Sequence, residues 1–272
     1  MPKFQAAAIA AVEMTPEFGQ PRTAIVTGGA KRIGAAIVRA LATDGWHVVI
    51  HCNRSADEAE ALRVEIEDAG GAARVVRADL ADADAAAQVI AEAAAWGPPL
   101  GLLVNNASRF DYDTHRDFDL AGWTRHMDVN LRAPALLSRA FAAAVPTGLN
   151  GLIVNMLDVK LFSLNPDFFT YTISKYGLLG LTELSARALA PHIRVNGIAP
   201  AVTMVSGPQS RDNFEKAHTY NPLGRGVQVE EIVGALRFIV ATPTLHGQVI
   251  TLDAGQRLLG MPRDVAFMVG NE

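Results

Sequence analysis

Several features that mark other classes of protein are missing from this chain of 272 residues. Its only cysteine is Cys52, which excludes an internal disulfide, and its seven histidines form no cluster with the spacing of a zinc site. No apolar run approaches the roughly 20 residues of a membrane helix. Charges of both signs are mixed and the net charge is −4, so no basic surface for nucleic acid is expected. These absences indicate a chain without metal, membrane or nucleic-acid partners in a reducing, cytoplasmic setting.

The first 21 residues precede the first expected strand and form an N-terminal extension. The apolar run 6–12 within it is closed by Glu13, which places it at the short limit for a signal peptide, and no clear cleavage site follows. We expect a loosely held extension. Translation that begins at Met14 is an alternative.

Short β-branched runs alternate with alanine-rich stretches from Arg22 onward. The runs that predict strands are 23–27, 47–52, 73–78, 102–106, 152–156, 194–198 and 248–252. The stretches that predict helices lie near 33–44, 56–69, 83–96, 120–145, 171–190 and 229–241. Continuous apolar runs are typical of strands covered on both faces. The alternation therefore predicts an α/β fold: a single doubly wound Rossmann domain over 22–272, with a seven-stranded parallel sheet and helices on both faces.

Two segments carry signals for ligand binding. Residues 200–228 are rich in proline and glycine and break the alternation, which predicts a substrate loop. The first strand runs into TGGAKRIGAAI (27–37), a glycine-rich turn before a helix. Such a turn lets the backbone approach a pyrophosphate, which the helix N-terminus then binds through its free N–H groups.

The end of the second strand favours NADP(H) over NAD(H). An NAD site usually has an acid about 20 residues after the glycine turn to bind the ribose hydroxyls. This chain has Asn53, Arg54 and Ser55 there, and Arg32 lies inside the turn. The arginines and the serine can pair with a 2′-phosphate. The alternative is that both arginines are solvated surface residues.

A tyrosine and a lysine one helical turn apart provide a candidate acid. Lys175 follows Tyr171 by four residues, so both side chains lie on one helix face. A nearby ammonium favours the phenolate, so we expect the pKa of Tyr171 to be lowered and the phenol to donate a proton near neutral pH. Asp158 stands thirteen residues before the tyrosine. Alone, the pair is also compatible with simple surface residues, and Asp158 with a turn or capping acid.

The motifs together resemble the short-chain dehydrogenases/reductases over residues 22–257. TGGAKRIG, NNAS (105–108), MDVN ending at Asn130, YTISK and RVNGIAP (194–200) occur in that family's order and spacing. The resemblance implies that Asn130, Tyr171 and Lys175 belong to a catalytic tetrad, and that the protein is a homotetramer. It also implies a set of cofactor-binding residues: Gly28, Lys31, Arg32, Ile33, Asn53, Arg54, Ser55, Asp79, Leu80, Asn106, Ala107, Ser108, Tyr171, Lys175 and Pro200.

Two departures from the general pattern are similar to the pteridine reductases, a branch that reduces pterins and folates with NADPH. Asp158 replaces the tetrad serine, and Arg32 replaces a glycine of the turn. NRSADEA, NNASRF with Phe110, and TLDAGQRL are further resemblances to this branch. The resemblance implies a substrate site of Arg32, Ser108, Phe110, Asp158 and Tyr171, in which the pterin stacks on Phe110.

The chemistry of Asp158 agrees with the resemblance to the pteridine reductases. A serine can donate to a carbonyl, whereas reduction of a ring C=N bond requires a proton on nitrogen, which an acid hydrogen-bonded to Tyr171 can supply. The leading hypothesis is an NADPH-dependent reductase that converts 7,8-dihydropterin, or dihydrofolate, to the tetrahydro form. One alternative is a carbonyl reductase, for example of 3-oxoacyl thioesters. A non-catalytic dinucleotide sensor is the alternative from another class. For Phe110, the alternative is an ordinary core aromatic residue.

Overall fold

The computed structural model describes residues 18, 21–206 and 209–269. The extension predicted for residues 1–21 therefore lies outside the described residues except at Phe18 and Pro21, and Phe18 packs its ring against Trp46. In the part of the chain that the structure describes, no helix is both long and apolar enough to cross a membrane.

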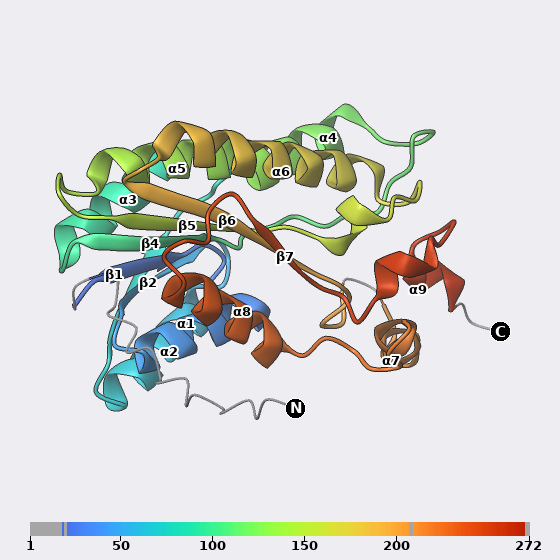
Figure 1. Cartoon of the computed structure of the whole chain (residues 1–272), viewed down its shortest axis with the longest axis horizontal. Coiled ribbons are helices and arrows are strands. Elements are labelled where there is room, and N and C mark those ends of the chain that lie inside the picture. The colour runs from blue at the N-terminus through green and yellow to red at the C-terminus, as the bar shows by residue number, and fades with distance from the viewer. Residues whose placement is uncertain (1–17, 19–20, 207–208, 270–272) are drawn as a thin grey trace, which may run out of the picture.

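A parallel sheet of seven strands forms the centre of the molecule (Figure 1). Its strands are β1 (Thr23–Val26), β2 (His47–Cys52), β3 (Ala72–Arg77), β4 (Leu100–Asn105), β5 (Gly151–Met156), β6 (Ile193–Pro200) and β7 (Val249–Leu252). Their order is β3-β2-β1-β4-β5-β6-β7, and every neighbouring pair is parallel. All residues of β1, β4 and β5 are buried, as expected of strands covered on both faces.

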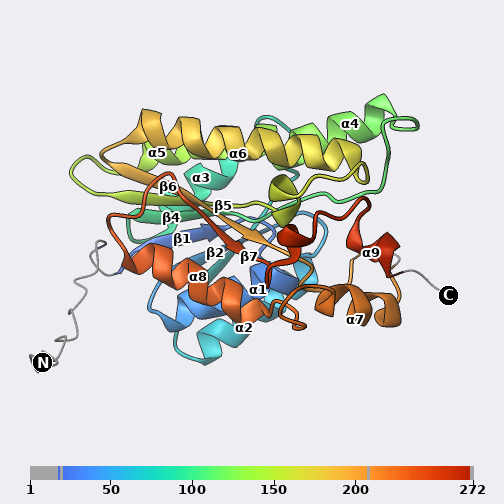
Figure 2. The same ribbon diagram turned by 45° about the vertical axis from the view of Figure 1, so that its right-hand side comes forward.

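Helices cover both faces of the sheet, which confirms the predicted doubly wound fold (Figures 1 and 2). The helices are α1 (Arg32–Thr43), α2 (Ala56–Asp68), α3 (Ala85–Trp96), α4 (Leu120–Met127), α5 (Ala133–Ala144), α6 (Phe169–Leu189), α7 (Arg211–Thr219), α8 (Val229–Ala241) and α9 (Val265–Met268). The apolar sides of α1, α2 and α8 pack on one face of the sheet, and those of α3, α5 and α6 on the other. The two resulting layers of buried side chains form the core of the fold.

Two predicted elements differ from the structure. The single helix expected over 120–145 is divided into α4, a π-helical segment (Asp128–Arg132) and α5. The segment 200–228, expected to be irregular, contains α7. Only Ala217 of α7 is buried, so the helix has no apolar stripe by which a sequence pattern could reveal it. Its N-cap at Ser210 and ion pairs between neighbouring turns stabilise it instead.

The strand order reverses direction between β1 and β4, and ligands of such sheets bind beyond the carboxyl ends of the strands at that point. Asn106, directly after β4, joins the two ends. Its backbone N–H donates to the Thr27 hydroxyl at 2.9 Å, and its side-chain amide donates to the Thr27 carbonyl at 2.8 Å. Helices α7 and α9 lie together beyond this edge (Figure 2).

Candidate active site

A cavity of about 1170 Å³ opens at the carboxyl edge of the sheet. It exceeds the roughly 300–1,000 Å³ of an ordinary small-molecule pocket, which suits a site for two ligands. Twelve of the residues singled out in the sequence line it: Gly28, Lys31, Arg32, Ile33, Asn106, Ala107, Ser108, Phe110, Asp158, Tyr171, Lys175 and Pro200. The structure therefore brings together residues that are up to 172 positions apart in the chain, such as Gly28 and Pro200.

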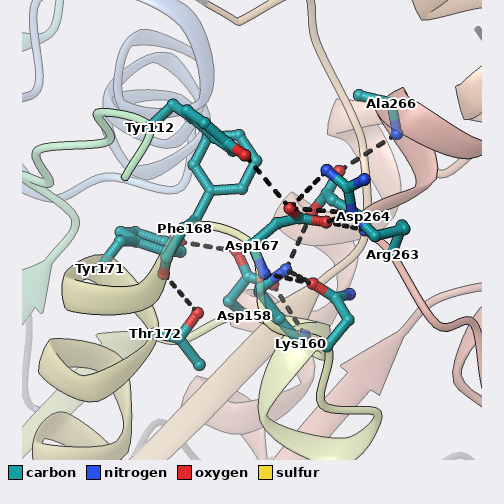
Figure 3. Close-up of polar contacts among 11 residues, drawn as sticks. Tyr112, Asp158, Lys160, Asp167, Phe168, Tyr171, Thr172, Arg263, Asp264 and Ala266 are labelled. Carbon is teal, nitrogen blue, oxygen red and sulfur yellow. Dashed lines mark hydrogen bonds and ion pairs between the residues drawn. The ribbon is translucent and has the colours of Figure 1, made fainter. Parts of the chain in front are cut away.

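Tyr171 and Asp158 are directly bonded. The Tyr171 hydroxyl donates to Asp158 Oδ2 at 2.7 Å, and the backbone N–H of Lys160 donates to Asp158 Oδ1 at 2.8 Å (Figure 3). Tyr171 lies in the first turn of α6 and is 5% exposed, whereas Asp158 precedes a short 3-10 helix (Val159–Phe162) after β5. Both oxygens of the carboxylate are thus held, and its orientation toward the phenol is set by the backbone.

The pKa of Tyr171 contradicts the prediction that Lys175 lowers it. Burial, followed by the charge and the hydrogen bond of Asp158, raises the pKa of Tyr171 well above its ordinary value. Burial also lowers the pKa of Lys175 to about 8 and raises that of Asp158. The Lys175 ammonium donates to the Met156 carbonyl at 2.7 Å and lies 5.7 Å from the centre of the Tyr171 ring. The carboxylate at bonding distance therefore outweighs the more distant ammonium, and the phenol keeps its proton.

Asn130 does not line the cavity, but it holds the loop that does. It is 1% exposed and lies in the π-helical segment, a distortion that is frequent at functional sites. Its side-chain amide donates to the Arg109 carbonyl at 2.9 Å and to the Ser174 hydroxyl at 3.0 Å, and its Oδ1 accepts from the Arg109 N–H at 2.7 Å. The Ser108 hydroxyl donates to the same Oδ1 at 3.3 Å.

The glycine turn is closely packed. A Cβ atom on Gly34 would lie 2.2 Å from the Gly28 carbonyl oxygen, so only glycine fits there. Arg32 has a φ of 55°, in the left-handed region that arginine rarely adopts and that the family's glycine would adopt without strain. Its guanidinium donates to the Ser206 hydroxyl at 3.3 Å and to the Met204 carbonyl at 3.4 Å. Arg32 therefore connects the glycine turn with the segment 200–228, which the sequence predicts to be a substrate loop.

Sequence reasoning missed His51, which supports the same turn. Its Nδ1 accepts from the Gly28 N–H at 3.2 Å, and its Nε2 lies 3.2 Å from the Ala78 carbonyl. The ring is 2% exposed, and burial lowers its pKa to about 4, so the imidazole is neutral and Nε2 carries the proton. A histidine inside an apolar strand was the only available signal.

Of the residues expected at a 2′-phosphate, Arg32 lines the cavity, whereas Asn53, Arg54 and Ser55 lie outside its lining. Asn53 and Arg54 are exposed directly after β2, and Ser55 begins α2 as its N-cap. Arg54 makes no ion pair with another residue of the described chain, so its charge is available to a ligand. Asp79 and Leu80 follow β3 at the same edge, and the Leu80 side chain is buried.

An aromatic wall lies beside the tyrosine. The Phe110 ring meets the Tyr171 ring edge to face at 4.7 Å and stacks on Phe168 at 4.2 Å. Phe168 also stacks on Phe267 at 6.1 Å, and Tyr112 contacts both of these rings. Phe110 remains 40% exposed and lines the cavity, so it is not a core aromatic residue.

The C-terminal segment forms part of the cavity, which sequence reasoning did not foresee. Met261 and residues 264–267 line it, and we call residues 261–267 the C-terminal wall. Figure 3 shows the charged residues that attach this wall to the segment between β5 and α6. The spacing of MPRDVAF carries no recognisable pattern, because these residues act through partners about 100 positions earlier in the chain.

The arrangement suits a dinucleotide and a flat substrate. The helix N-terminus and closely packed glycines offer a cradle for a pyrophosphate, and Lys175 reaches the cavity beside Tyr171. A protonated phenol, a carboxylic acid with a raised pKa and a partly exposed aromatic face are then available to the second ligand. Such a site can deliver a proton to the heteroatom of a double bond whose carbon receives a hydride.

Comparison with known proteins agrees with these features. A family model for short chain dehydrogenases matches residues 22–215. The chain is 31% identical over 238 residues to a 3-oxoacyl-[acyl-carrier-protein] reductase of Synechocystis sp., covering 86% of this chain and 96% of that protein. It is 43% identical to FolM alternative dihydrofolate reductase 1 of Brucella canis, solved in complex with NADP, with a TM-score of 0.84 over 87% of this chain and 94% of that one. The corresponding complex from Brucella suis gives the same TM-score of 0.84 and identity of 43%, over 88% and 96%.

Proposed function

This chain belongs to the short-chain dehydrogenase family and is an oxidoreductase of that family, and from this premise we propose that it reduces a dihydropterin with NADPH. The observation that carries the proposal is the bond between Tyr171 and Asp158 in the place where a carbonyl reductase has serine. The product is a tetrahydropterin, and dihydrofolate is a candidate substrate within the same class.

The choice of NADP(H) over NAD(H) rests on the positive charge of Arg54 and on the lack of an acid beside it. Arg54 is exposed, unpaired within the described chain and located at the edge where the adenosine half of a dinucleotide binds such a sheet. No acid stands beside it to bind ribose hydroxyls; Asn53 and Ser55 flank it instead. The two FolM structures that contain NADP share 43% identity with this chain, which supports the same cofactor here.

Different residues of the site would bind different parts of the cofactor. Gly28, Lys31, Arg32 and Ile33 would form the pyrophosphate cradle, and Lys175 would hold the nicotinamide ribose beside Tyr171. Asn106, Ala107, Ser108 and Pro200 line the cavity around these groups. When bound, NADPH supplies a hydride, which carries the two electrons that reduce the ring C=N bond. The chain's own task is to orient the substrate and to supply the proton.

The proton comes from the pair of Tyr171 and Asp158. Burial and the carboxylate keep the Tyr171 phenol protonated, and burial raises the pKa of Asp158 above its ordinary value. As a ring carbon receives hydride, the adjacent ring nitrogen takes a proton from the hydrogen-bonded pair of Tyr171 and Asp158, and solvent water restores that proton to the pair. Phe110 provides the face on which the pterin stacks, while Arg32 and Ser108 meet its polar edge.

A carbonyl reductase is the second candidate, because the chain is 31% identical to a 3-oxoacyl-[acyl-carrier-protein] reductase. In that case Asp158 would replace a serine that donates to a carbonyl, and it could do so only in its protonated form. The two substrates differ in where charge develops: on oxygen in a ketone and on a ring nitrogen in a pterin. A carboxylic acid with a raised pKa serves the second case better.

The deciding experiment measures NADPH oxidation by the purified protein with 7,8-dihydrobiopterin, dihydrofolate and a 3-oxoacyl thioester in parallel. We expect turnover with at least one of the two pteridines and a value of kcat/KM for the thioester that is at least about 100-fold lower, since Asp158 replaces the serine that donates to a ketone. Preference for the thioester would favour the carbonyl reductase instead.

A further inference from the structure

An ion pair with a buried lysine joins the C-terminal wall to the segment between β5 and α6, which carries Asp158. The Lys160 ammonium lies 3.1 Å from Asp264 Oδ2, and their side chains are 6% and 20% exposed (Figure 3). Lys160 also donates to Asn165 Oδ1 and lies 5.5 Å from the centre of the Phe168 ring. A lysine is rarely so deeply buried without a partner, so the pair is an intrinsic part of this corner of the cavity.

A second ion pair holds the same two segments together. Asp167, 2% exposed, accepts from Arg263 Nε at 2.7 Å and from the Asp264 backbone N–H at 2.8 Å. Arg263 Nη2 donates to the other oxygen of the carboxylate at 2.8 Å, so the contact is bidentate. Two consecutive residues of the C-terminal wall are therefore bound to the segment between β5 and α6. Arg263 binds Asp167, and Asp264 binds Lys160; we call Lys160 and Asp167 the anchors.

Phe168, between these anchors and α6, is held in a strained backbone conformation. Its φ is 54°, which a bulky side chain rarely adopts. The conformation accompanies the placement of the ring between Phe110 and Phe267, which belongs to the wall. The wall thus continues the aromatic surface that begins beside Tyr171.

Lys160 connects the C-terminal wall with Asp158. Its backbone N–H fixes Asp158 Oδ1, while its ammonium binds Asp264. The charged and titratable groups that face Asp158 are Tyr171 and Lys175 from α6 and Lys160 from its own segment, and Asp264 acts on Tyr171 from the wall. A displacement of Asp264 would therefore release the Lys160 ammonium, whose charge acts on Asp158, and would remove an anion that acts on Tyr171.

We propose that Lys160 and Asp264 are positioning residues whose ion pair keeps the C-terminal wall closed on the substrate side of the cavity and sets the orientation and charge environment of Asp158. The kinetic part of this inference rests on the proposed reductase function, whereas the structural part does not. The wall is then a part of the active site that the chain contributes from its last residues.

The test uses Lys160→Met and Asp264→Asn, with Lys216→Met as the matched control. Lys216 pairs with Asp212 at the same distance of 3.1 Å, but both side chains are exposed on α7. Asparagine keeps the oxygen with which Asp264 caps the Ala266 N–H, so α9 retains its cap. Each variant is examined in the intact protein.

The first measurement is hydrogen exchange of the amides of residues 264–268. Both variants should exchange there about tenfold or more faster than the parent, because local opening no longer breaks an ion pair. The Lys216→Met variant should match the parent. Unchanged exchange in both variants overturns the proposal.

The second measurement separates positioning from mere stability. In the titration of Asp158, followed by the NMR signal of its carboxyl carbon, Lys160→Met should raise the pKa of Asp158 because a cation is lost. Asp264→Asn should lower that pKa because the charge of Lys160 is no longer balanced by an anion. Loosening alone would move both variants in one direction, so shifts of the same sign overturn the proposal. Neither measurement requires a substrate.

The third measurement is turnover. If the parent reduces dihydropterin, both variants should raise KM about tenfold, because the wall no longer confines the substrate, while NADPH affinity stays as in the control. A KM equal to that of the control contradicts the role of the wall. If the parent shows no activity with any pteridine, the proposed function fails, and exchange and titration alone decide whether the pair closes the wall.

Discussion

The Tyr171 hydroxyl donates to Asp158 at 2.7 Å, and each residue changes the proton affinity of the other. Burial, followed by the charge of the carboxylate, raises the pKa of Tyr171, and the hydrogen bond from the phenol opposes the rise in the pKa of Asp158 that burial causes. Proton donation at this site is therefore a property of the pair. The separate contributions can be measured by substitution at each position.

Removing the phenol hydroxyl should abolish reduction. Tyr171→Phe eliminates the proton donor, and the loss of a general acid typically costs about 10²–10⁴ in rate. The ring and its contact with Phe110 remain, so NADPH affinity should change little. Steady-state kinetics and a fluorescence titration with NADPH measure the two quantities. Activity close to that of the parent would mean that the proton has another source.

Changing the acid should separate pterin chemistry from carbonyl chemistry. Asp158→Asn keeps the shape and Asp158→Ser restores the usual donor, but neither can hold the proton that a ring nitrogen needs. Both should reduce dihydropterin about 10²–10⁴-fold more slowly than the parent. Asp158→Ser should improve turnover of a 3-oxoacyl thioester relative to Asp158→Asn. If both variants reduce dihydropterin as fast as the parent, Asp158 has no catalytic role and the carbonyl reductase becomes the better candidate.

Arg54 should determine the preference between cofactors. Loss of a charge-assisted pair with a phosphate costs about 1.5–3 kcal/mol, so Arg54→Ala should weaken NADPH binding roughly tenfold or more. NADH lacks the 2′-phosphate, and its affinity should hardly change. Dissociation constants for both cofactors in both proteins provide the measurement. Equal affinity of the unmodified protein for NADPH and NADH would contradict the assignment.

His51 should support cofactor binding in its neutral form. His51→Ala removes the acceptor of the Gly28 N–H, and an unsatisfied buried donor costs about 1–3 kcal/mol, so the glycine turn loosens and NADPH affinity falls. His246→Ala is the matched control, because His246 also bonds a backbone N–H and a backbone carbonyl, but away from the turn. Both variants should lose stability, whereas only His51→Ala should lose affinity.

The same histidine contributes to the dependence of stability on pH. Its pKa is about 4 in the folded protein and about 6.5 when unfolded, so the unfolded state binds more protons between these values. Stability should therefore fall as the pH decreases from 6.5 to 4, and His51→Ala should flatten this decrease. Denaturant unfolding at a series of pH values measures the slope.

Lys175 should have a corresponding effect at alkaline pH. Its pKa is lowered from 10.5 to about 8 by burial, so between these values the unfolded state again binds more protons and stability rises with pH. The contribution is at most about 1.4 kcal/mol per pH unit. Lys175→Met should remove this rise in urea unfolding of the cofactor-free protein. An unchanged slope would show that the ammonium is not destabilised by burial.

The sequence alone determined the architecture and most of the residues that line the cavity. Continuous apolar strands must be covered on both faces, and strands that alternate with helices must run parallel, so local patterns were sufficient to predict the sheet. The glycine turn, Asp158, Tyr171 and Lys175 lie near the carboxyl ends of strands or on one helix face, where the fold itself brings them together.

Only the tertiary structure decided what depends on contacts between distant segments. The pKa of Tyr171 depends on how deeply the phenol is buried and on how close the Asp158 carboxylate lies, and a spacing in sequence contains neither quantity. Helix α7 is too polar to show an apolar stripe, and Lys160 bonds to Asp264, 104 positions away. Long-range polar contacts leave no periodic pattern in a single sequence, because their partners are set by the packing of the whole chain.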